Sequence, residues 1–476
     1  MSRSADAVAW TAGRTDAAAG AMAPATYREV WLWTVLALAS LALAGVFALL
    51  LAVSRVPGVE TVFPWPLGFF HKALVVHVVF SFVVWFLAIF GALLAIAASR
   101  EGAGSWDRAL GLGAAGATAA AFPLLFVPAL LDRGEPTLND YVPVIIDPLY
   151  YAGLALVAAA VACAVLRLMI AAATGGAART PFAKAMVGAG VVYLAALVCG
   201  GIALRLLADE PLSFTFNQEL LWGAGHVLQA LNTLLMLVAW TVLLAATPLG
   251  PGVPRPVLAT AVGLLVGCAL VAPAFYLIGE PFSAEQADAF TQLQYGFGPP
   301  ALLVGGAVLI ACRVRPLPWS EPAFFALAVS MPVFFVGAAL GLFVDGGDTR
   351  TPAHYHGVIA GVTLAFMGLF YQVLLPALGR RVPRGRVIKW QLGLFGGGQL
   401  AASLGLFVAG GYGAPRKAAG ADQGLESLGA MAGMTMNGIG GLVAVAGGVL
   451  FVVLVIRALV RPADAKIPDI KRLVAL

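Results

Sequence analysis

Five histidines are the residues of this chain best suited to bind a metal or a metal-bearing cofactor: His71, His77, His226, His354 and His356. All five lie inside or beside long apolar segments. Neutral imidazole binds first-row transition metals through a ring nitrogen, and it is a common axial ligand of haem iron. An ionisable ring at membrane depth is costly to keep, so each of these histidines is a candidate functional residue.

The spacing of the last two histidines indicates how their rings point. His354 and His356 stand at the start of the apolar run DTRTPAHYHGVIAGVTLAF, residues 348–366. Residues two apart on an α-helix point roughly 200° apart, because the helix has about 3.6 residues per turn. The two rings therefore face opposite sides of one helix, which could ligate two cofactors. His71 and His77 differ by about 120° on the same basis, so they cannot both ligate one haem.

The composition places these histidines in a lipid bilayer. Of the 476 residues, 61% are hydrophobic and only 11% are charged, which lies far outside the range of soluble domains. Apolar segments of about twenty residues recur along the chain, and each can cross a hydrocarbon core of roughly 30 Å as a helix. We therefore predict an all-α polytopic membrane protein with twelve transmembrane helices. The predicted spans are residues 31–53, 68–98, 109–131, 141–172, 184–208, 217–247, 255–278, 296–313, 321–345, 352–378, 388–412 and 429–460.

The distribution of lysine and arginine predicts the orientation. These residues concentrate in the N-terminal segment, the even-numbered loops and the C-terminal segment, which the positive-inside rule assigns to the cytoplasm. We expect a disordered cytoplasmic N-terminus over 1–27, a membrane domain over 28–462 and a cytoplasmic tail over 463–476. The protein would lie in a bacterial-type inner membrane with both termini cytoplasmic. The net charge of +5 reflects this topology and indicates no nucleic-acid partner.

This orientation brings the candidate ligands together in depth. The second, sixth and tenth helices begin on the extracytoplasmic side, so His77, His226, His354 and His356 form a layer nearer that side. Asp147 and Glu219 are the main carboxyls of the membrane interior, and both also lie toward the outer face. We therefore expect that any protons used there come from the extracytoplasmic side.

This pattern resembles the catalytic subunit I of the haem-copper oxidases over nearly the whole chain. The shared features are twelve membrane helices, one histidine in helix two, one in helix six and an H-x-H pair opening helix ten. The resemblance implies that His77 and His356 hold a low-spin haem and that His354 holds a high-spin haem. The chain has no CxxCH motif for covalent attachment, and two b-type haems are the simplest expectation.

Two further motifs carry the resemblance. GYGAPRKAAG, residues 411–420, resembles the basic pair that binds the haem propionates, which implies that role for Arg416 and Lys417. WGAGHVLQALNTLL, residues 222–235, resembles the helix-six motif that supplies the first copper ligand, which implies that His226 is a ligand of a second metal.

The sequence departs from the family pattern where two further copper-binding histidines are expected. No histidine lies between His226 and His354; instead, residues 276–298 offer Glu280, Gln292, Gln294 and Tyr295. Copper favours imidazole and thiolate, whereas oxygen ligands suit iron better. Three possibilities stay open: no second metal, a site completed by Glu280 or the glutamines, or a non-haem iron as in the related nitric oxide reductases.

The resemblance implies a membrane oxidoreductase in which electrons pass through the low-spin haem to the high-spin haem, where oxygen or nitric oxide is reduced. His354 and His226 would be the catalytic residues. The four cysteines show no CxxC spacing, and no copper-thiolate motif or cytochrome c domain is present. Electrons would then come from a partner subunit, cytochrome c or quinol. The alternative is a non-catalytic electron-relay or gas-binding protein that has lost the copper site.

Overall fold

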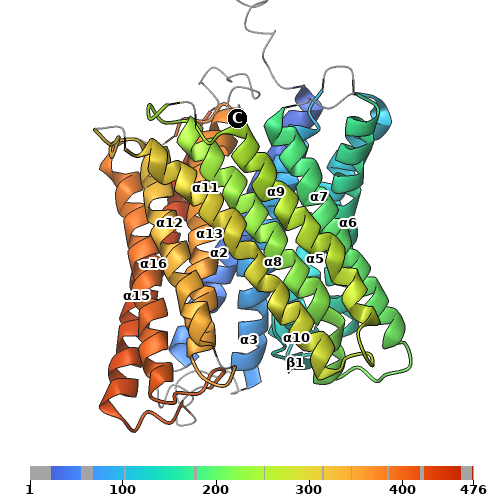
Figure 1. Ribbon diagram of the computed structural model, residues 1–476, viewed down its shortest axis with the longest axis vertical. Coiled ribbons are helices and arrows are strands. Elements are labelled where there is room, and N and C mark those ends of the chain that lie inside the picture. The colour runs from blue at the N-terminus through green and yellow to red at the C-terminus, as the bar shows by residue number, and fades with distance from the viewer. Residues whose placement is uncertain are drawn as a thin grey trace, which may run out of the picture.

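The computed structural model of the protein describes residues 23–54, 68–100, 103–175, 180–250, 252–313, 316–344, 346–382, 385–418, 423–462 and 474. Within these ranges, 12 helical spans are long and apolar enough to cross a membrane, which confirms the predicted all-α polytopic fold. The spans stand side by side in one bundle (Figure 1). The start of α2 lies at the upper end of this view.

Successive spans alternate in direction through the bundle (Figure 1), and several of them consist of more than one helical segment. In chain order the segments are α2 (Pro24–Ser54), α3 (Gly68–Val78), η2 (Val79–Val84), α4 (Trp85–Ala97), α5 (Ser105–Leu130), α6 (Pro148–Ala173), α7 (Pro181–Leu206), α8 (Phe214–Ala245), α9 (Arg255–Val271), η3 (Ala272–Leu277), α10 (Ala284–Leu293), η4 (Gln294–Phe297), α11 (Gly298–Ala311), α12 (Pro322–Leu340), η5 (Gly341–Phe343), α13 (Arg350–Leu369), η6 (Phe370–Leu374), α14 (Leu375–Ala377), α15 (Arg386–Gly411) and α16 (Leu428–Val460).

The first helix begins earlier than the sequence pattern indicates. Helix α2 starts at Pro24, so the last residues of the segment predicted to be disordered, 1–27, are helical. The rest of that segment lies outside the described residues. So does most of the predicted tail, 463–476, of which only Val474 is described.

The fourth span differs most from its prediction, because its first residues form a hairpin instead of a helix. Strand β1 (Glu135–Thr137) pairs antiparallel with β2 (Val144–Ile146), and helix α6 begins only at Pro148. Proline at the first helical position has no N–H to satisfy, and the Asp147 side chain accepts a hydrogen bond from Leu149 N at 2.9 Å. Asp147 therefore caps α6 at the start of the fourth span.

The eighth span is also broken. The structure builds it from α10, a 3₁₀ turn and α11, so it runs from Ala284 to Ala311 and starts twelve residues before the prediction. The additional helix α10 lies at the lower end of the bundle (Figure 1).

Two of the spans that carry predicted ligands contain a π-helical segment. Segment η2 begins two residues after His77, and η6 interrupts the span of His354 and His356 farther along the helix. Trp85, just after η2, stacks on Phe370, the first residue of η6, with ring centroids 5.6 Å apart and planes 16° apart. π-Bulges recur at functional sites because they redirect the side chains that follow them.

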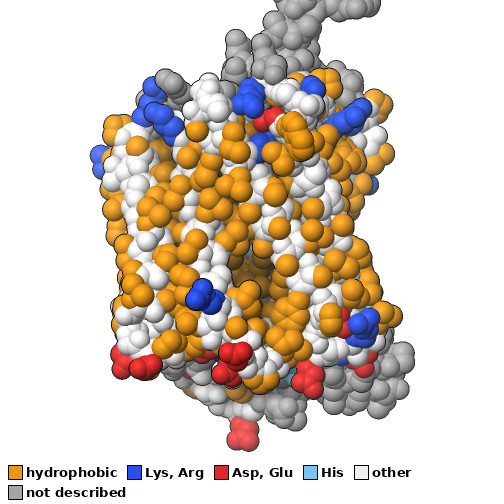
Figure 2. All heavy atoms as spheres, turned by 90° about the vertical axis from the view of Figure 1, so that its right-hand side faces the viewer, with side chains coloured by type: hydrophobic (Ala, Val, Ile, Leu, Met, Phe, Trp, Pro, Cys, Tyr) orange, Lys and Arg blue, Asp and Glu red, His pale blue; other side chains and the backbone are white. Residues whose placement is uncertain are grey.

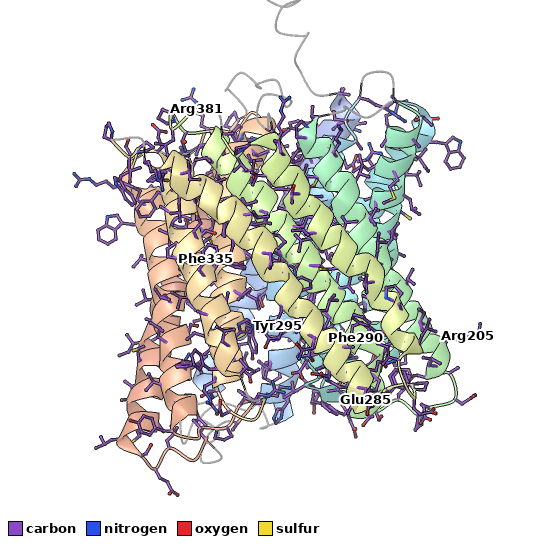
Figure 3. The ribbon with its side chains drawn as sticks, viewed as in Figure 1. Arg205, Glu285, Phe290, Tyr295, Phe335 and Arg381 are labelled. Atoms are coloured by element: carbon purple, nitrogen blue, oxygen red, sulfur yellow. The ribbon has the colours of Figure 1, made fainter. Side chains whose placement is uncertain are left out.

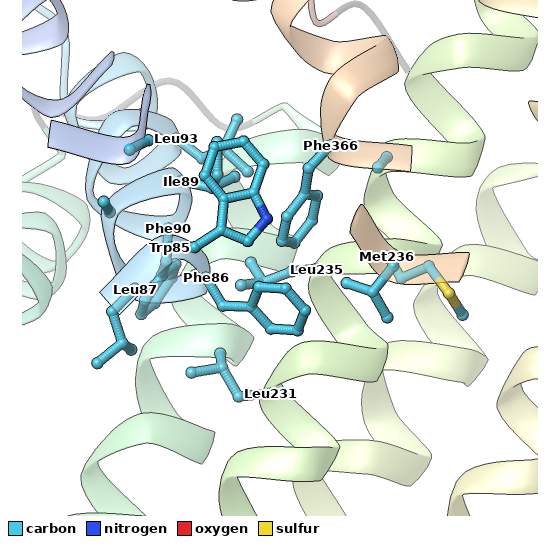
Figure 4. Close-up of a cluster of buried hydrophobic side chains, with 14 of the residues drawn as sticks. Trp85, Phe86, Leu87, Ile89, Phe90, Leu93, Leu231, Leu235, Met236 and Phe366 are labelled. Carbon is cyan, nitrogen blue, oxygen red and sulfur yellow. The ribbon is translucent and has the colours of Figure 1, made fainter. Parts of the chain in front are cut away.

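The upper part of the interior is an apolar core. Leu231, Leu235 and Met236 of α8 lie beside Phe86 and Phe366 from α4 and α13, and all are almost completely buried (Figure 4). These residues follow the histidines along their helices, so the core lies on the upper side of the histidine layer. Dense packing of such side chains holds the helices in register.

An ion cluster at the upper end joins three helices. Arg167 of α6 lies 2.6 Å from Glu29 of α2 and 3.0 Å from Asp107 of α5, and Asp107 also binds Arg100 at 3.0 Å. The Arg167 and Glu29 side chains are only 5% and 3% exposed, so the two charges must neutralise each other.

Charged side chains divide between the two ends of the bundle. On the face drawn in Figure 2, lysines and arginines gather along the upper edge and acidic residues along the lower edge. This asymmetry is the observation on which the predicted orientation rests.

Candidate functional site

His354 is anchored through one ring nitrogen. It lies near the lower end of α13, and its Nδ1 is 2.8 Å from the carbonyl oxygen of Gly337 on α12. Because a carbonyl only accepts, Nδ1 carries the proton and Nε2 of the neutral ring carries the lone pair. Among the described residues, none forms a hydrogen bond with Nε2 of His354. Gly341 makes room for the ring, since a Cβ there would lie 2.6 Å from Nδ1.

His77 is held in the same tautomer. Its Nδ1 lies 2.9 Å from the carbonyl oxygen of Ala44 on α2, so this nitrogen is also the donor. His356, two residues after His354 on α13, stacks on the neighbouring Tyr355 with ring centroids 5.4 Å apart. His77 and His356 are both partly exposed although they belong to membrane-spanning helices. His71 is exposed and contacts Phe70 edge-on.

Both ring nitrogens of His226 have a partner. The ring is fully buried on α8, and Nδ1 donates to the carbonyl oxygen of Trp222 at 2.8 Å. Nε2 must then accept, and it does so from the hydroxyl of Tyr141 at 2.9 Å. The Tyr141 oxygen in turn accepts from Nε2 of Gln294 at 2.8 Å. These bonds form one directed chain from Gln294 to the backbone of α8.

Three aromatic rings enclose His226. Their centroids lie 4.5 Å (Tyr141), 4.7 Å (Trp222) and 5.9 Å (Phe290) from the imidazole. Phe290 comes from α10 and is labelled in the lower half of the bundle in Figure 3. Gly225 admits the tyrosine, because a Cβ at this position would lie 2.5 Å from Cβ of Tyr141.

The hairpin that carries Tyr141 is tied to the lower end of α8. The backbone N–H of Asp140 donates to Gln218 Oε1 at 2.9 Å, and Asn217 donates to Thr137 Oγ1 at 3.1 Å. Tyr141 itself has φ 65°, a left-handed conformation that costs an aromatic residue about 1–3 kcal/mol. The surrounding contacts must offset this cost, so they hold the ring in a defined position.

Burial raises the pKa of the Tyr141 hydroxyl, and the negative charge of Asp140 acts in the same direction. The hydroxyl keeps its proton at neutral pH and can donate it to the hydrogen bond with His226. Tyr141 is not recognisable as a site residue from the sequence, because it stands at the start of the predicted span 141–172. The signal in the sequence is the pair of glycines in WGAGH, because glycines in a membrane helix indicate that other groups approach it closely.

The oxygen donors proposed for a second metal do not converge on His226. Glu280, Gln292 and Tyr295 are exposed, and only Gln294 reaches the site, where it binds Tyr141. In the described part of the chain, no three histidine, cysteine or acidic side chains form a group that could hold a metal ion.

The predicted propionate-binding cations lie between α15 and α16 and contact the same hairpin. Arg416 and Lys417 pair with Asp140 at 3.2 Å and 3.3 Å, and Lys417 also donates to the carbonyl oxygen of Leu138. Burial lowers the pKa of Lys417, with Asp140 opposing that shift and Arg416 adding to it. Asp140 therefore links the basic pair to the residue next in sequence, Tyr141.

The histidines of the site fit a haem but do not fit a second metal ion. His354 and His77 each fix Nδ1–H on a backbone carbonyl, the arrangement that orients a metal-binding imidazole and directs its Nε2 lone pair to the metal. They suit axial ligation of haem iron. At His226 the corresponding lone pair is used by Tyr141, so the residues present there do not fit a second metal.

A twelve-helix bundle with histidines in its second, sixth and tenth spans defines a polytopic membrane oxidoreductase of the haem-copper oxidase type. The chain belongs to the family described as "Cytochrome C and Quinol oxidase polypeptide I", whose pattern it matches over residues 28–443. Proteins of this family generally bind haem. The resemblance to subunit I of the haem-copper oxidases, inferred from the sequence, is thereby confirmed.

Individual proteins are also similar to this chain. The chain is 28% identical over 353 residues to an uncharacterized protein of Aquifex aeolicus (strain VF5), covering 72% of this chain and 84% of the relative. It is 24% identical over 494 residues to an uncharacterized protein of Rickettsia prowazekii (strain Madrid E), covering 88% and 94%. A solved haem-copper terminal oxidase dimer has a similar fold, with TM-score 0.74 and 13% identity over 94% of this chain and 87% of that chain.

Proposed function

We propose that this protein passes electrons through a low-spin haem held by His77 and His356 to a high-spin haem held by His354, where oxygen or nitric oxide binds. One observation carries the proposal: the Nδ1 of His354 is fixed on Gly337 O at 2.8 Å, which leaves its Nε2 lone pair as the donor. A haem ligated on one side only has an open axial position for a gas. When bound, the haems supply the redox chemistry of the site.

The chain's own residues would orient and retain these haems. His77 keeps its tautomer through Ala44 O at 2.9 Å, and His356 projects from the face of α13 opposite to His354. Arg416 and Lys417 lie at the lower end of the bundle, where their charges would neutralise carboxylate substituents of a porphyrin. Both haems are proposed to be b-type.

Protons are proposed to arrive from the lower face, which we assign to the extracytoplasmic side of a bacterial-type inner membrane. The upper side of the histidine layer is closed by the apolar core of Leu231, Leu235 and Phe366. Polar groups gather instead at the lower end, around Asp140 and Gln218. Both chain termini would then be cytoplasmic, and the electron donor would be a partner subunit, cytochrome c or quinol.

Optical spectroscopy of the purified protein tests the proposal. We expect a reduced spectrum with two haem components, of which only one shifts on addition of carbon monoxide. His354→Ala should remove the CO-sensitive component, and His77→Ala or His356→Ala should remove the other. The exposed His71→Ala is the matched control and should change neither. A haem-free wild-type preparation would contradict the proposal.

A second candidate function is an electron-relay or gas-binding protein without turnover. The observation that favours it is the hydrogen bond that occupies His226, the residue expected to complete a catalytic metal pair. The two candidates differ in one measurement. Steady consumption of oxygen or nitric oxide with an artificial electron donor supports the oxidoreductase, whereas stoichiometric gas binding without consumption supports the relay.

A further inference from the structure

We infer that the hydroxyl of Tyr141 occupies Nε2 of His226 with a hydrogen bond. This site therefore binds no second metal ion and holds a phenol hydroxyl in its place. The inference rests on the proposed function, because it describes the surroundings of the site where the gas would bind. It also makes a statement about metal content that can be tested whether or not the protein turns over.

The argument begins with the lone pairs of the imidazole. A neutral histidine has one nitrogen that donates and one that accepts, and only the accepting nitrogen can ligate a metal. Nδ1 of His226 donates to Trp222 O at 2.8 Å within its own helix, so Nε2 is the only possible ligand atom. That atom accepts from Tyr141 at 2.9 Å. In His354 the corresponding Nε2 has no hydrogen-bond partner among the described residues.

Several independent features hold Tyr141 in this position. Its backbone adopts the left-handed conformation, φ 65°, which bulky residues rarely do. Gly225 leaves the space that the ring occupies, since a Cβ would come within 2.5 Å of it. Gln294 donates to the tyrosine oxygen at 2.8 Å, which directs the hydroxyl proton toward His226. Hydrogen bonds from Asp140 N and Asn217 fasten the hairpin to the outer end of α8.

Among the residues that the structure describes, His226 is also not part of any group of three histidine, cysteine or acidic side chains that could hold a metal ion. Trp222 and Phe290 pack against the imidazole with centroids 4.7 Å and 5.9 Å away, so the enclosure is mainly aromatic. Copper and iron sites need several nitrogen, sulfur or carboxylate donors, and one histidine with an aromatic enclosure does not supply them. The hydroxyl of Tyr141 keeps its proton, and it is already used in the hydrogen bond to Nε2 of His226.

Metal analysis of the purified full-length protein tests the inference directly. Haem is quantified by the pyridine haemochrome method, and total iron, copper, zinc and manganese are measured by mass spectrometry on the same sample. We expect total iron to equal haem iron, with no other metal near one equivalent, before and after incubation with Cu²⁺ or Fe²⁺ and desalting. One equivalent of copper or non-haem iron per chain would overturn the inference.

Variants separate this result from general loss of structure. His226→Ala should leave the metal-to-protein ratio at the wild-type value, because His226 holds no ion. A non-haem metal that is present in wild type and lost in His226→Ala would contradict the inference, and the more conservative His226→Asn repeats the comparison if the alanine variant does not fold. Failure of the proposed function would appear differently, as absence of haem from the preparation. The non-haem metal content of the same preparation would still test the inference.

Discussion

The hydroxyl of Tyr141 lies 2.9 Å from Nε2 of His226 and joins a β-hairpin to the buried face of the sixth membrane span. This contact fixes both the tautomer of the histidine and the position of the hairpin. Through Asp140, the same hairpin also holds Arg416 and Lys417. The lower end of the bundle is therefore one connected assembly of hydrogen bonds and charges around the histidine layer.

Tyr141→Phe should destabilise the protein although it removes a single oxygen atom. The change leaves the buried Nε2 of His226 and the amide of Gln294 without their partner, which costs about 1–3 kcal/mol. The measurement is the thermal unfolding midpoint in detergent. Tyr295→Phe, at a side chain 61% exposed, is the matched control and should leave the midpoint unchanged. Equal midpoints for both variants would show that the hydrogen bond contributes little.

Gly341→Ala should displace His354 and remove the CO-sensitive haem component. The added methyl group would lie 2.6 Å from Nδ1 of His354, closer than any normal contact, so the ring must turn away from Gly337. Gly306→Ala adds the same group to a helix where nothing lies within 4 Å, and its spectrum should match wild type. CO difference spectra distinguish the two variants, and an intact CO-sensitive component in Gly341→Ala would refute the proposed ligand.

Replacing the basic pair should weaken haem retention. If Arg416 and Lys417 neutralise haem carboxylates, the double variant Arg416→Gln, Lys417→Gln should lose a large fraction of its haem during detergent extraction. Asp140→Asn removes the carboxylate that now pairs with both cations, and it should leave the haem content near the wild-type level. Haem-to-protein ratios check both expectations. Full haem content in the double variant would show that these cations only pair with Asp140 and do not help to retain haem.

Arg167→Met should destabilise the protein strongly at the upper end of the bundle. It leaves the buried carboxylate of Glu29 without its 2.6 Å partner, and breaking a buried pair typically costs about 3–5 kcal/mol. Thermal midpoints should fall well below those of Arg205→Gln, which alters an exposed arginine. Adding Glu29→Gln to Arg167→Met should restore part of the loss, since the uncompensated charge is then removed.

Asp348 should make stability depend on acid pH. Although burial opposes the shift, hydrogen bonds and charge from Arg350 hold the pKa of this carboxyl below its ordinary value of 3.8. Because the folded pKa is the lower one, the stabilisation is fully present above about pH 3.8 and is lost as the pH falls through the folded pKa. Thermal midpoints measured down to about pH 3 should fall less steeply in Asp348→Asn than in wild type. Parallel curves would argue against this contribution.

The fold could be predicted from the sequence because each membrane helix satisfies its own backbone hydrogen bonds. Apolar runs of sufficient length therefore define the spans without knowledge of their neighbours, and the number of spans was correct. The pattern of histidines was likewise local: one in span two, one in span six and a pair opening span ten. Length and composition could not define the fourth span, because residues 141–147 are as apolar as a helix yet form the end of a hairpin.

What the sequence determined by itself is the class of protein and the helices that carry its imidazoles, since periodicity and residue type are properties of single segments. What only the tertiary structure decided is the partner of each imidazole. Gly337 and His354 are 17 residues apart, and Tyr141 and His226 are 85 apart. Hydrogen bonds of this kind depend on how helices and loops pack against each other, and no local pattern along the chain encodes them.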